Sequence, residues 1–282
     1  MLAFVLAIRT ITSPFVYVDP SGFVRLFGKP SVRSKVGQAR QPDLAPDRQS
    51  FVYWTETDDT LREQNLRTGK ERILVMGNVR SGRYAADGKT IFFSNDPKDS
   101  WDLYAVDRAT GKSRIVLAEK SAGGSISAPR PQMDGTIVVI AGSQVLRIDQ
   151  EGKVLWRTTV TPHDPDDDMD PDVMAPSPGS GNRFVGGWWT QDMDERLVGS
   201  DGTAGALWVY EASTFRCHRI TPRTIHASNP CWTRDGKEVL YAGGPVNGRK
   251  GIWSIQPNGM ETHFLIRGDE PSAGVPEAQR SK

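Results

Sequence analysis

The chain repeats one short pattern along its length, and this repetition constrains the fold more than any other feature of the sequence. In each copy a tight turn separates two strand-like segments, of which the second is apolar. Three copies carry Asp-Gly in the turn, a pair that favours a β-hairpin because the turn requires a positive φ. The copies are "APDRQSFVYWTE" (45–56), "AADGKTIFFSND" (85–96), "QMDGTIVVIAGS" (132–143) and "TRDGKEVLYAGG" (233–244).

A second unit, made of a strand, a tight turn and a return strand, follows each of these hairpins. Its copies are "LREQNLRTGKERILV" (61–75), "LYAVDRATGKSRIVL" (103–117), "VLRIDQEGKVLWRTT" (145–159), "LWVYEASTFRCHRIT" (207–221) and "IWSIQPNGMETHFLI" (252–266). The two units together make a four-stranded antiparallel meander, and no segment shows a helical period of useful length. The 28 glycines and 19 prolines also suit a turn-rich chain. We therefore predict an all-β fold.

The number of repeats predicts a six-bladed β-propeller that spans residues 1–282 as a single domain. The segment "FVYVDPSGFVRLFG" (15–28) reads as a second unit, so the chain begins one strand late, with "LAFVLAI" as the second strand of the first blade. The C-terminal "GVPEAQRSK" (274–282) is expected to supply the missing strand, which closes the ring and removes an exposed edge. The expected blades are 276–282 with 2–28, 41–76, 80–118, 126–160, 169–221 and 228–267.

Proline marks the strand that borders the central channel. Proline cannot donate a hydrogen bond to a ladder, so it belongs on an edge strand, and the inner strand of a propeller blade has no neighbour on the channel side. The expected channel positions are Pro42, Gly82, Pro129, Pro171, Pro230 and Pro276. The residues that follow them are Asp43, Arg83, Arg130, Asp172, Cys231 and Glu277. The two cysteines, Cys217 and Cys231, fall on an outer and an inner strand, and we predict free thiols.

This repeat resembles that of the TolB-like six-bladed β-propellers, whose PD40-type unit reads roughly P-x-W-S-P-D-G-k-x-I-a-F. The segment "NPCWTRDGKEVLYAGG" (229–244) is the best copy, and "QPDLAPDRQSFVYWTE" (41–56) keeps Pro-Asp without the glycine. Propellers of this kind are similar to a periplasmic protein-binding module, to the gating domain of prolyl-oligopeptidase-type proteases and to some polysaccharide lyases. The protease function requires a G-x-S-x-G nucleophile elbow, and neither "PGSGN" (178–182) nor "GSDGT" (199–203) fits it. The resemblance implies a periplasmic or secreted protein, although the apolar run in "MLAFVLAIRT" is short for a signal peptide.

An acidic segment, "PHDPDDDMDPD" (162–172), lies in the connection between the fourth and fifth blades. Five of its aspartates alternate along the chain and would share one face of an extended segment. They are Asp164, Asp166, Asp168, Asp170 and Asp172. Hard cations accept several oxygen ligands of this kind, so calcium is the candidate cofactor. The alternative is a solvated acidic loop.

The connections between blades gather at one mouth of the channel, where a ligand site is expected. His163 and His226 fall on adjacent blades at this rim, and both are candidate bases. The candidate ligand-binding arginines are Arg40, Arg80, Arg83 and Arg130, because arginine binds carboxylates through two parallel hydrogen bonds. A lyase acting on uronic-acid polymers would need such a base, together with arginine or a metal to stabilise the enolate. Arg130 is therefore also a candidate catalytic residue.

Trp188 and Trp189 stand at the longest departure from the repeat, and one of them is a candidate stacking platform for a sugar or a protein partner. Two functions follow from these features. The first is a non-catalytic binding or scaffold module for a protein or glycan at the channel mouth. The second is a metal-assisted, uronate lyase-like enzyme that uses the same mouth. The near balance of 35 basic and 34 acidic residues disfavours nucleic acid and membrane as partners, and we expect a monomer.

Overall fold

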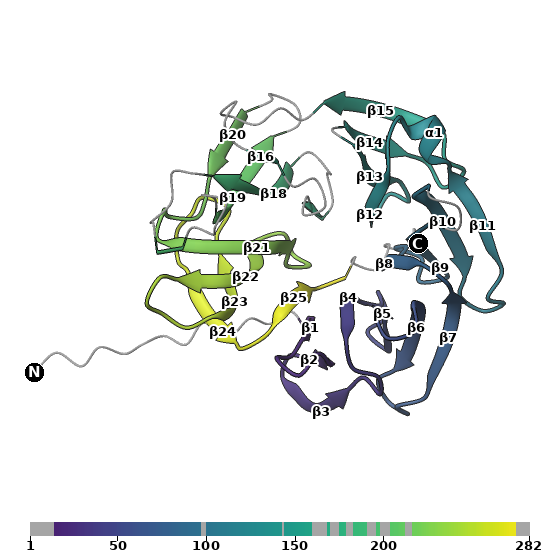
Figure 1. Ribbon diagram of the computed structural model, residues 1–282, viewed down its shortest axis with the longest axis horizontal. Helices are drawn as coiled ribbons and strands as arrows, with labels where there is room; N and C mark the ends of the chain where they lie inside the picture. Colours follow the sequence, from purple (N-terminus) through teal and green to yellow (C-terminus); the bar gives the residue numbers. More distant parts are fainter. Residues whose placement is uncertain are drawn as a thin grey trace, which may run out of the picture.

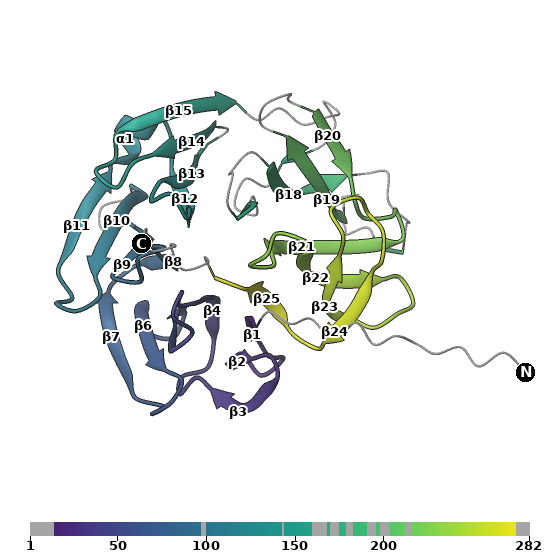
Figure 2. The same cartoon turned by 180° about the vertical axis from the view of Figure 1, so that it is seen from behind.

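The computed structural model shows a ring of six antiparallel sheets around a central channel (Figure 1). It describes residues 14–96, 100–142, 144–159, 168–169, 175–178, 183–190, 196–197, 204–211 and 216–274. Figure 2 shows the same ring from behind. The predicted all-β fold and six-bladed propeller are confirmed, and the one helix among the described residues is the single turn α1 (Glu119–Ala122).

Each blade is a meander whose strands run from the channel to the outer rim. Blade 2 contains β4 (Ala39–Leu44), β5 (Ser50–Thr55), β6 (Thr60–Asn65) and β7 (Glu71–Met76). Blade 3 contains β8 (Val79–Tyr84), β9 (Thr90–Asn95), β10 (Asp102–Asp107) and β11 (Ser113–Leu117). Blade 4 contains β12 (Ile126–Pro131), β13 (Ile137–Ala141), β14 (Gln144–Ile148) and β15 (Val154–Thr159).

The remaining blades follow the same plan, with one variation. Blade 6 contains β21 (Ile225–Trp232), β22 (Val239–Pro245), β23 (Gly251–Ile255) and β24 (His263–Ile266). In blade 5 the innermost position is taken by two short strands, β16 (Asp168–Met169) and β17 (Ala175–Pro176), which both pair with β18 (Arg183–Thr190). Its outer strands are β19 (Ala204–Glu211) and β20 (Arg216–Arg219).

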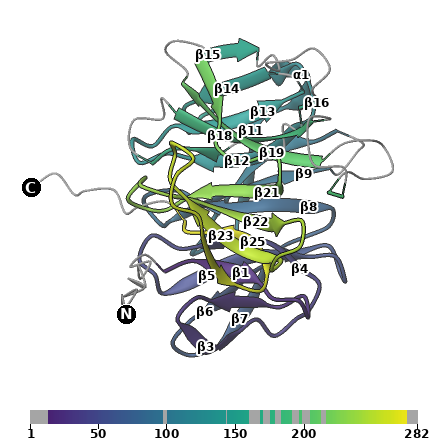
Figure 3. The same ribbon diagram turned by 90° about the vertical axis from the view of Figure 1, so that its left-hand side faces the viewer.

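Strands from the two ends of the sequence share blade 1, as predicted, and this sharing closes the ring. The sheet order is β25 (Asp269–Ser272), β1 (Val16–Val18), β2 (Val24–Leu26) and β3 (Lys29–Arg33). Both the face view and the side view place β25 between the strands of blade 6 and β1 (Figure 1, Figure 3).

The predicted strand assignment within blade 1 is wrong by one strand. The inner strand is β25 (Asp269–Ser272) and the second strand is β1 (Val16–Val18), whereas the prediction used 276–282 and 2–8, which both lie outside the described residues. The physical reason is the short connection: only residues 267–268 separate β24 from β25, just as only residues 77–78 separate β7 from β8. Pro271, not Pro276, is consequently the channel proline of this blade.

The hydrophobic core lies between the blades. Alternate residues of one strand point to opposite faces, so a strand buried on both sides reads as a continuous apolar run. Strand β13 has the sequence IVVIA: Ile137 and Val139 pack toward blade 3, while Val138 and Ile140 pack toward blade 5. Each of the six interfaces between neighbouring blades holds a cluster of this kind. This packing holds the inner strands in fixed positions around the channel.

Candidate site in the central channel

The inner strands share a local distortion at the proline or glycine predicted to border the channel. The pairing register breaks there in β4, β8, β12 and β21, which marks a β-bulge in each strand. The residue before the proline or glycine has a positive φ in four strands: Gln41 (43°), Ser81 (57°), Asn229 (48°) and Glu270 (48°). Non-glycine residues rarely adopt this conformation, and such strain is often found at functional sites.

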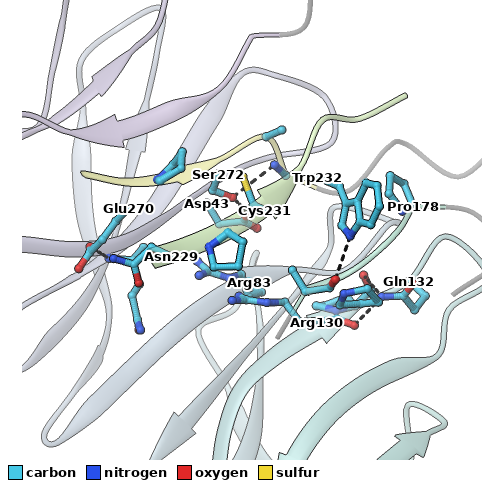
Figure 4. Close-up of a pocket in the computed structure, with 18 of the residues that line it drawn as sticks. Asp43, Arg83, Arg130, Gln132, Pro178, Asn229, Cys231, Trp232, Glu270 and Ser272 are labelled. Carbon is cyan, nitrogen blue, oxygen red and sulfur yellow. Dashed lines mark hydrogen bonds between the residues drawn. The ribbon is translucent and has the colours of Figure 1, made fainter. Parts of the chain in front are cut away.

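The bulged strands surround a cavity of about 110 Å³ at the centre of the ring (Figure 4). Residues that follow the channel proline or glycine line it in five blades: Asp43, Arg83, Arg130, Cys231 and Ser272. Four of these five were expected from the sequence. Ser272 stands in place of the predicted Glu277, because β25 is the inner strand of blade 1.

Asp43 is the most enclosed charged group of the cavity, at 2% exposure. Its carboxylate accepts hydrogen bonds from the Ser272 hydroxyl (2.7 Å) and from the Tyr84 backbone N–H (2.9 Å). Burial raises the pKa of Asp43, while the nearby Arg83 guanidinium and these two hydrogen bonds act in the opposite direction. One carboxylate thus connects blades 1, 2 and 3.

Arg83 is 8% exposed and is held by backbone carbonyl groups. Its Nη1 donates to the carbonyl oxygens of Gln41 (2.7 Å), Pro42 (3.1 Å) and Gly82 (3.2 Å). These bonds fix one edge of the guanidinium group. Its Nε and Nη2 groups have no hydrogen-bond partner among the described residues, and the side chain projects into the cavity (Figure 4).

Glu270 lies at the opposite side of the cavity from Gln132 (Figure 4). Its carboxylate accepts a hydrogen bond from the Gln41 backbone N–H and lies 3.6 Å from the Arg40 guanidinium. Burial raises the pKa of Glu270 from 4.5 to about 7, with Asp269 acting in the same direction and Arg40 and Arg83 against it. A carboxyl group that titrates near neutral pH at a cavity wall can change the charge of the site within the physiological range.

This shift predicts a specific pH dependence of stability. A carboxyl group whose pKa is higher in the folded state stabilises the fold below its unfolded-state pKa, and this contribution is lost as the pH rises from 4.5 to about 7. The stability difference between the native chain and Glu270→Gln should therefore change by about 2–3 kcal/mol between pH 4.5 and pH 8. Urea denaturation at a series of pH values measures this.

A matched control is Glu56→Gln, which removes the other carboxylate partner of Arg40, at 2.9 Å. The free energy of unfolding of Glu56→Gln should change with pH between 4.5 and 7 by the same amount as that of the native chain. Parallel curves for the native chain and Glu270→Gln would contradict the assignment of this titration to Glu270.

The other half of the cavity combines an apolar wall with one unsatisfied polar atom. The Trp232 indole N–H donates to the Ala175 carbonyl oxygen at 2.9 Å, so the ring is held against β17. Gln132 is 4% exposed, and its amide nitrogen donates to the carbonyl oxygens of Arg130 (2.9 Å) and Pro131 (3.2 Å). The Gln132 side-chain oxygen has no hydrogen-bond partner within the described part of the chain.

Three predicted site residues, Arg40, Arg80 and His226, do not line the cavity. Arg40 pairs with Glu56 and Glu270. Arg80 is exposed and stacks over the Trp101 ring, with 4.5 Å between the guanidinium carbon and the ring centroid. His226 accepts a hydrogen bond at Nδ1 from the Gly205 backbone N–H (3.1 Å), and burial lowers its pKa, with Lys250 acting in the same direction.

Most of the acidic segment lies outside the described residues. His163, Asp164, Asp166, Asp170 and Asp172 lie outside the described residues, and Asp168 falls in the short strand β16. Within the ranges that the structure describes, no group of three or more His, Cys, Asp or Glu residues is arranged to hold a metal ion. The calcium site therefore stays a prediction.

The tryptophan pair falls within β18, where Trp188 and Trp189 pair with Met169 and Asp168 of β16. Their predicted stacking role also stays a prediction. Cys217 and Cys231 are free thiols, as predicted, and burial raises the pKa of Cys231 to about 12.

Sequence reasoning missed Glu270, Ser272, Asn229 and Gln132, which all line the cavity. The signal for Asn229 and Glu270 was available, because each directly precedes a channel proline, as Gln41 does. Gln132 carries no such mark in the sequence.

No protein-family model and no curated protein matches the sequence. Among solved structures, TolB from Acinetobacter baumannii superposes with a TM-score of 0.67 at 15% identity, covering 92% of this chain and 65% of that one. An oligogalacturonate lyase from Vibrio parahaemolyticus gives 0.55 at 12% identity, covering 92% and 80% of the two chains. An oligogalacturonate lyase in complex with manganese gives 0.55 at 15% identity, covering 87% and 70%.

These likenesses define the class of fold: the chain is a TolB-like six-bladed β-propeller. It spans slightly less than two thirds of the length of the TolB chain. None of the helices in the described ranges is long and apolar enough to cross a membrane.

Proposed function

We propose that the chain is a non-catalytic binding module, a monomer that receives part of a protein or glycan ligand in the central cavity. The observation that carries this proposal is the convergence of polar side chains from blades 1, 2, 3, 4 and 6 on one cavity. Residues from so many separate blades meet there only because the ring is closed. Binding sites commonly occupy such concave positions, with a few polar groups that fix the orientation of the ligand.

Several groups that line the cavity are also held in position by hydrogen bonds within the protein. Asp43 and Arg83 are held by hydrogen bonds to neighbouring strands, and Trp232 is fixed by its bond to β17. Binding to a site that is already ordered loses less conformational entropy than binding to a mobile one. This preorganisation supports a role in recognition.

The test compares two cysteine variants on arrays of peptides and acidic oligosaccharides, with and without calcium. Cys231→Met places a larger side chain in the cavity, whereas Cys217→Met makes the same change in β20, away from it. We expect ligands bound by the native chain and by Cys217→Met to be lost in Cys231→Met. Each variant is melted first, because added volume in a packed site costs about 1–3 kcal/mol. Equal binding by all three proteins would place the binding surface elsewhere and contradict the proposal.

A second candidate function is a uronate lyase-like reaction in the same cavity. The specific observation is Glu270, a carboxyl group with a pKa of about 7 that shares the cavity with Arg83 and Arg130. A carboxylate of this kind can remove a proton next to a uronate carboxyl group, and an arginine can stabilise the resulting enolate. Formation of an unsaturated product from oligogalacturonate, seen by ultraviolet absorbance and lost in Glu270→Gln, would make the chain an enzyme. That result would overturn the non-catalytic proposal.

A further inference from the structure

A second concave surface lies on the seam where blade 6 meets blade 1, beside β25 (Figure 1). It is a groove of about 720 Å³ formed by three connections: the turn that follows β1, the turn between β22 and β23, and the link between β24 and β25. None of the described residues that line the groove also lines the central cavity. The groove is therefore a separate candidate site.

Two glycines bring the basic parts of these connections together. Lys250 precedes Gly251, where a Cβ atom would lie 2.9 Å from the Arg267 Cα atom. Arg267 precedes Gly268, where a Cβ atom would lie 2.7 Å from the Val18 carbonyl oxygen. Only glycine allows such close approaches, so the backbone segments that carry Lys250 and Arg267 are packed against each other. Arg249 adds a third positive charge from the same turn as Lys250.

The groove also contains two carboxylates, and both already have partners outside it. Asp19 pairs with the Arg25 guanidinium at 2.8 Å. Asp269 accepts hydrogen bonds from the Asn229 side-chain amide (3.0 Å) and from the Glu270 backbone N–H (2.7 Å). The Glu270 carboxylate lines the central cavity and not the groove. With Asp19 neutralised by Arg25, Asp269 is the one carboxylate that shares the groove with the three cations among the described residues.

The three cations keep donors available for a ligand. Arg267 is exposed and has neither a hydrogen bond nor an ion pair with the described residues. The Arg249 guanidinium carbon lies 5.3 Å from the centroid of the Phe264 ring, a contact that orients the group without occupying its N–H donors. The Lys250 Nζ donates to the Gly244 carbonyl oxygen at 3.1 Å and has two further donors. Like charges on adjacent connections repel one another, and an anion bound among them removes this repulsion.

The balance of charge favours an anion that carries two negative charges. Arg249, Lys250 and Arg267 against the carboxylate of Asp269 are balanced by a dianion, whereas a carboxylate ligand supplies a single charge. A phosphate monoester is close to a dianion at pH 8, because its second pKa is about 6. Its oxygen atoms also match the planar fork of arginine and the compact charge of lysine.

The groove is much larger than a phosphate group, and the rest of its lining is mostly polar. Asn247 and the backbone of Gly248 lie in the same turn as Arg249, where they offer hydrogen bonds to hydroxyl groups. Val18 and Pro20 are the only apolar side chains among the described lining residues, so little apolar surface is available for the side chains of a peptide. An uncharged ring that carries hydroxyl groups suits such a lining.

We propose that the groove binds the phosphate group of a phosphorylated sugar. Arg249, Lys250 and Arg267 hold the phosphate, and Asn247 binds hydroxyl groups of the sugar ring. This site lies outside the central cavity and is independent of the function proposed for that cavity.

The experiment is calorimetric titration of the full chain at pH 8 and low ionic strength with four probes: glucose 6-phosphate, glucose, inorganic phosphate and a phosphoserine tripeptide. We expect glucose 6-phosphate to bind and glucose to give no heat of binding. Inorganic phosphate and the phosphopeptide should bind roughly tenfold more weakly than glucose 6-phosphate, because they lack the hydrogen bonds of the sugar hydroxyl groups. Added salt should weaken the binding of all three phosphate probes, because it screens exposed charges.

Two substitutions separate the phosphate contact from the sugar contact. Arg267→Gln should weaken the binding of glucose 6-phosphate roughly tenfold, and Arg267→Lys, which keeps the charge without the fork, should fall between it and the native chain. Asn247→Ala should weaken the binding of glucose 6-phosphate and leave that of inorganic phosphate unchanged. Both residues are exposed, so none of these variants should lower the melting temperature.

The matched control is Arg67→Gln, which removes an exposed arginine from the outer turn of blade 2 and should bind glucose 6-phosphate as the native chain does. Cys231→Met, which alters the central cavity, should also keep this binding. A failure of the site in the groove and a failure of the function proposed for the cavity are therefore distinguishable.

Three results would overturn the inference. If the native chain binds none of the phosphate probes, the three cations are ordinary surface charge. Equal binding of glucose 6-phosphate by the native chain and by Arg267→Gln would place the site elsewhere. Binding of inorganic phosphate or the phosphopeptide as tightly as glucose 6-phosphate would show that the groove does not recognise a sugar.

Discussion

Gly152→Ala is expected to lower the free energy of unfolding by about 3 kcal/mol or more, through a backbone collision combined with an unfavourable φ. Gly152 lies in the turn between β14 and β15 with φ 87°. A Cβ atom at this position would lie 1.9 Å from the Val116 carbonyl oxygen in β11 of the neighbouring blade. Neither partner is a flexible side chain, so blades 3 and 4 would have to move apart. Urea denaturation measures the change.

The repeat supplies matched controls for this substitution. Gly69 and Gly111 occupy the same outer turn in blades 2 and 3, with φ 64° and 72°, and a Cβ atom at either position would meet nothing within 4 Å. Their alanine variants should lose only the conformational part, about 1 kcal/mol. Equal losses of unfolding free energy at all three glycines would show that the collision with Val116 contributes nothing and that the positive φ alone accounts for the destabilisation.

Arg83→Met is expected to destabilise the fold by about 3–5 kcal/mol at pH 8, because it removes the guanidinium group that acts most strongly on the buried Asp43 and leaves only the smaller effect of Arg130. It also removes the donor to the Gln41, Pro42 and Gly82 carbonyl oxygens. The loss should shrink in acid, where Asp43 takes up a proton; burial already raises the pKa of this carboxyl, and removal of Arg83 raises it further.

A double-mutant cycle with Asp43→Asn separates these two effects. In the Arg83→Met background, Asp43→Asn should recover about 1–3 kcal/mol, because the side chain keeps an acceptor for the Ser272 hydroxyl and no longer carries a charge. If the double variant is no more stable than Arg83→Met, the lost carbonyl contacts account for the whole cost, and the charge of Asp43 does not.

The repeat made most of the fold and the centre of the site predictable. Proline marks the strand at the channel because it has no backbone N–H to donate to a sheet and is therefore confined to an edge strand; glycine takes the same position in blade 3. This backbone property can be read from the sequence without knowledge of the tertiary structure. Asp43, Arg83, Arg130 and Cys231 could therefore be placed at the channel from their position after that residue, and all four line the cavity.

The strand that closes blade 1 could not be placed by the same rule, because Pro271 and Pro276 both follow the last outer strand and either one could occupy the channel position. Only the length of the connection from β24 decides between them, and connections between blades in this chain range from two residues upward. The role of Gln132 could not be predicted from the sequence for a different reason. Its importance comes from an unsatisfied oxygen atom, which depends on side-chain packing that no sequence pattern encodes.

Sharing blade 1 between the two ends of the sequence also has a consequence for biosynthesis. During translation β1 leaves the ribosome among the first described strands and β25 as the last of them. Until β25 pairs with β1, Asp43 lacks its hydrogen bond from Ser272, and one wall of the cavity does not exist. A nascent chain can therefore form several blades before its central cavity is complete enough to bind a ligand. A ligand that binds only the closed ring shifts the equilibrium toward the state in which β25 is paired with β1. Binding therefore occurs only after the ring has closed, and it then stabilises the closed ring.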